Sequence, residues 1–131
     1  MSKMDGKKKL ACIAYLSAKD QPAEWTEYIE KKQLNYIKDY ARAHNIEIIG
    51  VVHRGELGPY EASRQFELIV KRIENGEING VIATNMMTIS KDISDAYYKI
   101  GRVNASGGKM ITVDEGELRL RFKTRGGYER D

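Results

Sequence analysis

Four short runs of apolar and β-branched residues are spaced along the chain, and each has the length of a buried strand. They are Lys9–Leu16, Ile46–Val52, Gly80–Thr84 and Lys109–Val113. A further segment, Glu117–Phe122, alternates charged and apolar residues, which is typical of a strand at the edge of a sheet.

The segments between these strands carry apolar residues at helical spacing. The clearest case follows i, i+3, i+4 and i+7 through Phe66, Ile69, Val70 and Ile73. Pro22 lies near the start of an earlier helix that fades at His44. Asp92 caps a later helix that Gly107 ends.

Because strands and helices alternate, the pattern predicts an α/β fold in three layers. We expect a mostly parallel sheet of four to five strands with helices on both faces and right-handed crossovers. The 131 residues suffice for one domain with a real core, and no internal repeat is present. We place this domain at residues 9–122, between a basic tail at 1–8 and a second basic tail at 123–131.

Composition narrows the class of protein. No apolar run approaches the roughly 20 residues that span a bilayer, and the run after the basic N-terminus is too short for a signal sequence. The single Cys12 forms no internal disulfide, so we expect a cytoplasmic protein without membrane contact. His53 has no His or Cys at ligand spacing, and no glycine-rich loop follows the first strand. We therefore expect neither a metal nor a cofactor.

The net charge of +3 is too small to indicate nucleic-acid binding by itself. Its distribution is more informative, because lysines and arginines gather at both ends of the chain. Such clusters suit contacts with a phosphate backbone, and they equally suit a solubilising tail.

Ser17 is the main candidate for chemistry. It follows the apolar run 10–16 and precedes a helix, so its hydroxyl is expected at the carboxyl end of a buried strand. Open α/β sheets bind their ligands at that edge.

Several motifs around and beyond Ser17 follow one another in a recognisable order. They are Ile13–Ser17 with Gln21, Gln33–Ala41, Asn45–Val52, and Thr88–Asp92. In these motifs the chain resembles the catalytic domain of serine recombinases, the resolvase and invertase family. The resemblance implies a resolvase-like, flavodoxin-like sheet and makes Ser17 the position of a nucleophile that attacks DNA phosphate, with Gln21 beside it.

The same comparison shows where the chain departs from the family pattern. Family arginines are replaced by Tyr15, Ser63, Thr88 and Lys91, and the last of these keeps its charge but loses the planar guanidinium. Two other arginines in the region offer substitutes, Arg54 and Arg64. The predicted site therefore consists of Ser17 and Gln21 with Arg54, Arg64 and Lys91 as phosphate contacts. Three aromatic residues, Trp25, Tyr28 and Tyr36, are expected to pack rather than to stack on bases.

The resemblance implies cleavage and rejoining of double-stranded DNA through a phosphoserine link, with activity weakened or lost because arginines are missing. The alternative is a binding module on the same fold that engages DNA or a recombinase partner without cutting. An unrelated flavodoxin-like or receiver-like domain is a third hypothesis. The family's helix for assembly and its helix-turn-helix DNA reader have no counterpart here. We therefore expect a monomer or weak homodimer that relies on a further DNA-binding domain or partner.

Overall fold

The computed structural model describes residues 9–18 and 21–120 of the chain. Both predicted tails, 1–8 and 123–131, lie outside the described residues, so the predicted domain boundaries remain predictions. Among the described helices, none is both long enough and apolar enough to cross a membrane.

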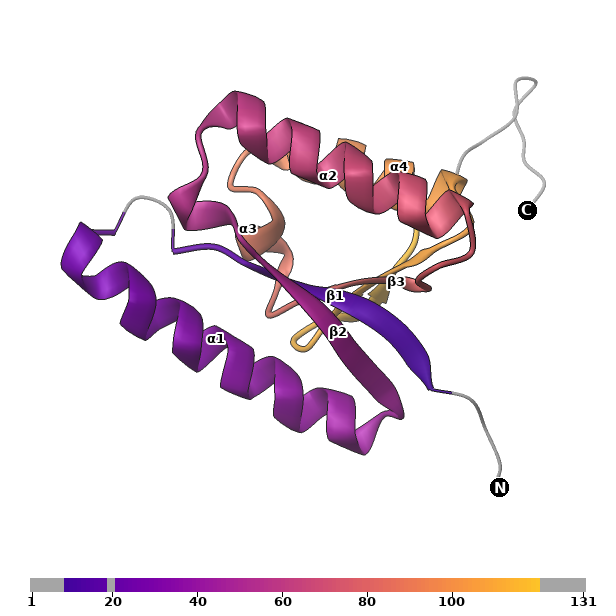
Figure 1. The fold of residues 1–131 in the computed structure, drawn as a ribbon, viewed down its shortest axis with the longest axis horizontal. Helices are drawn as coiled ribbons and strands as arrows, with labels where there is room; N and C mark the ends of the chain where they lie inside the picture. The colour runs from indigo at the N-terminus through magenta and orange to yellow at the C-terminus, as the bar shows by residue number, and fades with distance from the viewer. Residues whose placement is uncertain (1–8, 19–20, 121–131) are drawn as a thin grey trace.

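A β-sheet forms the centre of the molecule (Figure 1). It has five strands in the order β2-β1-β3-β4-β5. The strands are β1 (Leu10–Leu16), β2 (Ile46–His53), β3 (Gly80–Ala83), β4 (Lys109–Thr112) and β5 (Gly116–Leu118). The first four are mutually parallel, and β5 returns antiparallel to β4 through a tight turn. At the free edge, the pairing of β2 with β1 skips Ile49, which bulges out of the ladder.

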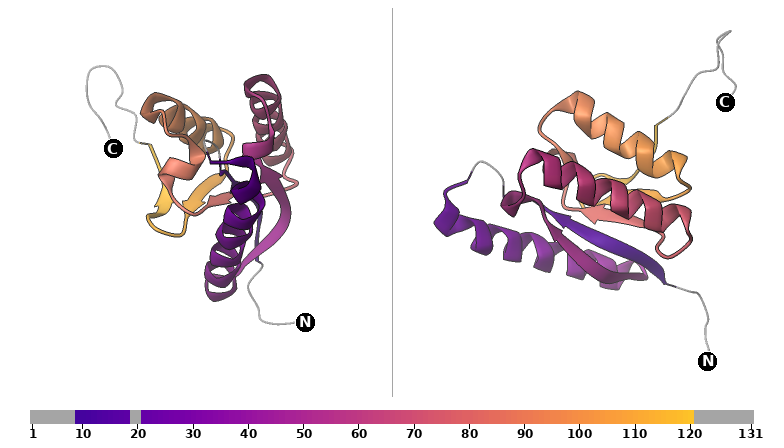
Figure 2. Two further views of the ribbon diagram at one scale, coloured as in Figure 1. Left: turned by 90° about the vertical axis from the view of Figure 1, so that its left-hand side faces the viewer. Right: turned by 45° about the horizontal axis from the view of Figure 1, so that its top comes forward.

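Helices cover both faces of this sheet (Figure 2). On one face lies α1 (Ala23–Ala43), and on the other lie α2 (Pro59–Glu74) and α4 (Ile93–Ala105). Two shorter helical segments, η1 (Arg54–Glu56) and α3 (Met86–Ile89), follow β2 and β3 at their carboxyl ends. The predicted three-layer α/β architecture with a mostly parallel sheet is confirmed.

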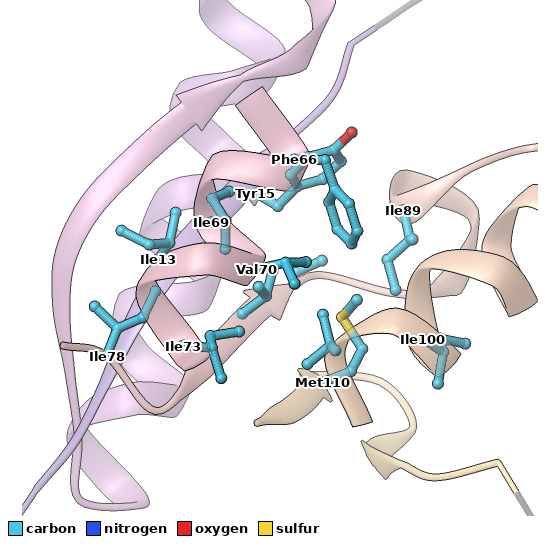
Figure 3. Close-up of a cluster of buried hydrophobic side chains, with 13 residues drawn as sticks. Ile13, Tyr15, Phe66, Ile69, Val70, Ile73, Ile78, Ile89, Ile100 and Met110 are labelled. Atoms are coloured by element: carbon cyan, nitrogen blue, oxygen red, sulfur yellow. The ribbon is translucent and has the colours of Figure 1, made fainter. Parts of the chain in front are cut away.

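The core is divided by the sheet into two apolar clusters. The larger one joins the sheet to α2 and α4, and Phe66, Val70 and Met110 lie at its centre (Figure 3). Gly80 in β3 is required by close packing, because a Cβ there would lie 2.1 Å from the Lys109 carbonyl oxygen.

Local details differ from the sequence-based expectation at a few points. The short helix α3 was not predicted; it begins with Asn85, whose side chain accepts from the Thr88 amide while the Thr88 hydroxyl accepts from the Asn85 amide. Strand β5 ends at Leu118, earlier than expected. In α4 the core-facing residues are Ala96, Ile100 and Val103, whereas two large apolar side chains of the same helix, Ile93 and Tyr97, are largely exposed.

Candidate functional site

A pocket of about 490 Å³ opens at the carboxyl end of the parallel strands. Its walls come from the segment after β1, from α1, from the start of η1, from α3 and from the first turns of α4. The polar lining side chains are Ser17, Gln21, Gln33, Arg54, Asn85, Thr88, Ser90, Lys91, Asp92, Asp95 and Lys99. The site therefore lies at the edge of the sheet where the fold class predicts a ligand.

The backbone of Ser17 is held by a single side chain. The Gln33 amide on α1 accepts a hydrogen bond from the Ser17 N–H at 2.9 Å and donates one to the Ser17 carbonyl oxygen at 2.9 Å. Among the described residues, the hydrogen bonds made to Ser17 are these two, and both involve its backbone. Gln33 thus holds the backbone of Ser17, and its two bonds do not use the Ser17 hydroxyl.

One helical turn before Gln33, the carboxylate of Glu30 secures the neighbouring segment. Glu30 is only 2% exposed and accepts from the Ala18 amide at 3.3 Å and from the Gly55 amide at 3.2 Å. Its other oxygen lies 2.7 Å from Nδ1 of His53. A Cβ on Gly55 would approach the Glu30 oxygen to 2.8 Å, so the lack of a side chain there allows the carboxylate to enter. Glu30 therefore ties α1 to the ends of both β1 and β2.

Arg54 begins η1 and places its guanidinium in the pocket wall. One of its terminal nitrogens donates to the Leu57 carbonyl oxygen at 2.8 Å. Close by is the hydroxyl of Tyr15, a side chain in β1 that points to the edge of the larger apolar cluster (Figure 3). Burial raises the pKa of Tyr15 to about 12, although the positive charge of Arg54 acts in the opposite direction. That hydroxyl is buried, and no hydrogen bond of good geometry reaches it from the described residues, although the Arg54 guanidinium lies close enough to favour its ionised form.

Another part of the pocket lining carries a charge pair on α4. The ammonium of Lys99, with 14% of its side chain exposed, is ion-paired with Asp95 and lies 5.6 Å from the centre of the Phe66 ring. Burial acts to raise the pKa of Asp95, but hydrogen bonds from Lys99 and Ser90 and the charges of Lys99 and Arg54 outweigh it. The net result is a lowered pKa, so Asp95 stays ionised and orders this wall.

Four of the five residues singled out from the sequence meet in this pocket: Ser17, Gln21, Arg54 and Lys91. The fifth, Arg64, lies on α2, where it is ion-paired with Glu61, and it does not line the pocket. Sequence reasoning missed Lys99, which the four-residue spacing from Asp95 on a predicted helix could have suggested. It also assigned no role to Gln33, whose helical position gave no indication of the loop it contacts.

The pocket contains three cationic side chains, Arg54, Lys91 and Lys99, and two carboxylates, Asp92 and Asp95. Asp92 is used as the cap of α4 and accepts from the Ser94 amide at 3.0 Å. Asp95 is used by Lys99. Within residues 9–18 and 21–120, no group of three or more His, Cys, Asp or Glu side chains is placed to hold a metal ion. The arrangement is suited to an anion beside a serine hydroxyl.

Solved structures similar to this chain share one fold. A resolvase family site-specific recombinase from Streptococcus pneumoniae superposes with a TM-score of 0.67 at 18% identity, over 82% of this chain and 74% of that one. The fold is that of a serine recombinase catalytic domain.

Two further serine recombinase structures agree. The C-terminal catalytic domain of ISC1926 TnpA, an IS607-like serine recombinase, gives a TM-score of 0.61 at 17% identity, over 79% of this chain and 67% of its own. The N-terminal catalytic domain of TP901-1 integrase gives 0.59 at 17% identity, over 83% of this chain and 79% of its own. No protein-family model and no curated protein sequence matches the chain. The likeness to the serine recombinase catalytic domain is therefore one of fold.

Proposed function

We propose that this domain binds a phosphodiester of the DNA backbone in the pocket beside Ser17, and that its capacity to cleave the strand is strongly reduced. The observation that carries the proposal is the convergence of Ser17, Gln21, Arg54 and Lys91, from separate segments of the chain, on one pocket. The serine recombinase fold supports the choice of DNA as the partner.

The charges of the pocket favour a phosphate. Arg54 and Lys91 line it together with Lys99, while the two carboxylates are occupied by the α4 cap and by Lys99. A guanidinium presents paired donors to phosphate oxygens, and an ammonium adds a compact positive charge. The side of the pocket next to Ser17 can therefore accept an anion.

We expect slow strand cleavage because the reaction requires cationic groups around the phosphate. When a serine oxygen attacks a phosphodiester, a serine–phosphate bond forms, a sugar oxygen leaves, and the transition state carries extra negative charge. Fixed cationic donors stabilise that charge, and the loss of one typically costs on the order of 10²–10³ in rate. Tyr15 and Thr88, at positions where the resemblance expects arginine, are neutral, and Lys99 is already engaged by Asp95.

Binding is tested by fluorescence anisotropy of a labelled duplex over a range of salt concentrations. We expect Arg54→Ala and Lys91→Ala each to weaken binding and to lower the salt slope by about 1, as expected when one phosphate contact is lost. Arg64→Ala should leave both the affinity for the duplex and its salt dependence unchanged, because Arg64 pairs with Glu61 outside the pocket. Arg72→Ala, paired with Glu77 at the far end of α2, is the matched control. Equal losses in all four variants, or no salt-dependent binding, would contradict the proposal.

Cleavage is tested separately with a nicked duplex that traps a covalent protein–DNA product. We expect no product, or product at a rate reduced by several orders of magnitude, and none from Ser17→Ala. Rapid trapping that depends on Ser17 would show that the remaining cations suffice for cleavage. It would overturn the proposed loss of cleavage activity and leave the proposed DNA binding intact.

Sedimentation at micromolar concentration tests the expected monomer or weak dimer, which a stable tetramer would contradict.

A further inference from the structure

One side of α1 carries an exposed row of aromatic side chains. Trp25, Tyr28 and Tyr36 are 51%, 54% and 49% exposed, and Lys32 lies among them. The spacings of three, four and four residues place all four side chains on the same side of the helix. These aromatic residues do not pack into the core, because the core-facing positions of α1 are Glu30, Ile37 and Ala41.

The members of this aromatic row contact one another. The rings of Trp25 and Tyr28 meet edge to face with centroids 6.2 Å apart. The ammonium of Lys32 lies 5.5 Å from the centre of the Tyr28 ring, within the range of a cation–π interaction. These contacts hold the side chains next to one another while each aromatic residue remains about half exposed.

The aromatic row adjoins the Ser17 pocket at two places. Ile29 and Gln33, each one residue beyond a member of the row, are part of the pocket lining. At the other end, the Tyr36 hydroxyl donates to Asp114 at 2.8 Å, and Asp114 accepts from Asn85, which lines the pocket. A strand with one phosphate at Ser17 would therefore lie within reach of the rings.

We propose that the aromatic row stacks bases of an unpaired DNA strand whose backbone occupies the pocket beside Ser17; this rests on the proposed function. Aromatic faces with a nearby cation are the usual platform for single strands, because every base has a stacking face. In a duplex the bases stack on one another and are not available to these rings. A protein partner is the main alternative, because tryptophan and tyrosine are enriched at protein–protein interfaces, although lysine is depleted there.

The single tryptophan of the chain is Trp25, so its fluorescence reports directly on the row. We expect a twelve-residue oligothymidylate to quench this fluorescence with saturation, and a duplex of the same length to quench it far less. Tyr28→Ala should weaken oligothymidylate binding about tenfold, the scale of one lost stacking contact. Lys32→Ala should weaken it less and lower its salt dependence. Tyr60→Ala, an 81% exposed tyrosine on α2, is the matched control and should change nothing.

Several results would overturn the proposal: absence of quenching, equal quenching by duplex, or equal effects of Tyr28→Ala and Tyr60→Ala. Concentration-dependent quenching without DNA, together with dimers in sedimentation, would assign the row to contact between copies of the chain. Arg54→Ala separates the two proposals. If the pocket proposal alone fails, oligothymidylate binding stays sensitive to Tyr28→Ala and insensitive to Arg54→Ala. If the row alone fails, duplex binding still depends on Arg54.

Discussion

The buried carboxylate of Glu30 provides the most direct test of how the pocket is built. Glu30→Ala removes the acceptor of two backbone N–H groups, those of Ala18 and Gly55, and the partner of His53. Ala18 is buried and Gly55 is half-buried, so water does not freely replace the lost acceptor at either amide. The side chain of His53 is 48% exposed and can turn to solvent.

The magnitude follows from these three partners. Each of the two backbone bonds is long, at 3.2–3.3 Å, and is expected to contribute about 1 kcal/mol. The half-exposed contact with His53 contributes no more than about 1 kcal/mol because solvent screens it. The total loss in free energy of unfolding is therefore about 2–3 kcal/mol. Glu30→Gln, which keeps one acceptor oxygen, should lose about half as much.

Urea denaturation followed by circular dichroism measures these differences in free energy of unfolding. The comparison holds when the variants share the same m-value, the slope of that free energy against urea concentration. Glu27→Ala, at an exposed position on the same helix, is the matched control and should change stability by less than about 0.5 kcal/mol. If Glu30→Ala is as stable as Glu27→Ala, the carboxylate does not hold the strand ends together, and the explanation given for Gly55 fails with it.

Three further predictions concern neighbouring side chains. Gln33→Leu should lower the free energy of unfolding by about 2 kcal/mol, because it removes both hydrogen bonds to the Ser17 backbone. It should also weaken duplex binding in the anisotropy assay, and unchanged binding would show that Ser17 needs no support from Gln33. Tyr15→Phe should leave stability unchanged or raise it by up to about 1 kcal/mol in urea denaturation, since no hydrogen bond of good geometry reaches the buried hydroxyl. A loss above about 1 kcal/mol would indicate that the hydroxyl bonds the neighbouring Arg54 guanidinium. The lowered pKa of Asp95 means that its stabilising effect is complete above its ordinary value, near pH 4, and is lost as the pH falls through the lower value in the folded state. The difference in free energy of unfolding between the wild type and Asp95→Asn should accordingly become smaller from pH 7 to pH 2. A difference that stays constant would contradict the stabilising role of the ionised Asp95 carboxylate.

Most of the fold could be predicted because its elements carry strong local signals. The buried strands are short apolar runs, and α2 shows four apolar residues at helical spacing. The short helix α3 could not be predicted in this way, since four residues are too few to establish a period. Its start depends on a reciprocal pair of hydrogen bonds between Asn85 and Thr88, which composition does not reveal.

The site was predictable only where a residue's position in the chain also fixes its position in space. Ser17 follows a central strand, so the fold alone brings it to the ligand edge. Arg54 and Arg64 looked equivalent in the sequence, but Arg54 directly follows β2 whereas Arg64 lies on the second turn of α2. The burial of Glu30 among glutamates and lysines of α1 was equally hidden, because it depends on backbone groups from two distant strand ends.

The bulge at Ile49 in β2 also affects how the protein behaves in concentrated solution. An edge strand of eight residues presents open backbone groups that invite pairing with another molecule. Here Ile49 and Val51 add apolar side chains to that edge. The skipped residue breaks the regular spacing and increases the local twist, so a second straight strand cannot continue the ladder along the whole edge. This irregularity works against aggregation and amyloid-like growth at the β2 edge of the sheet.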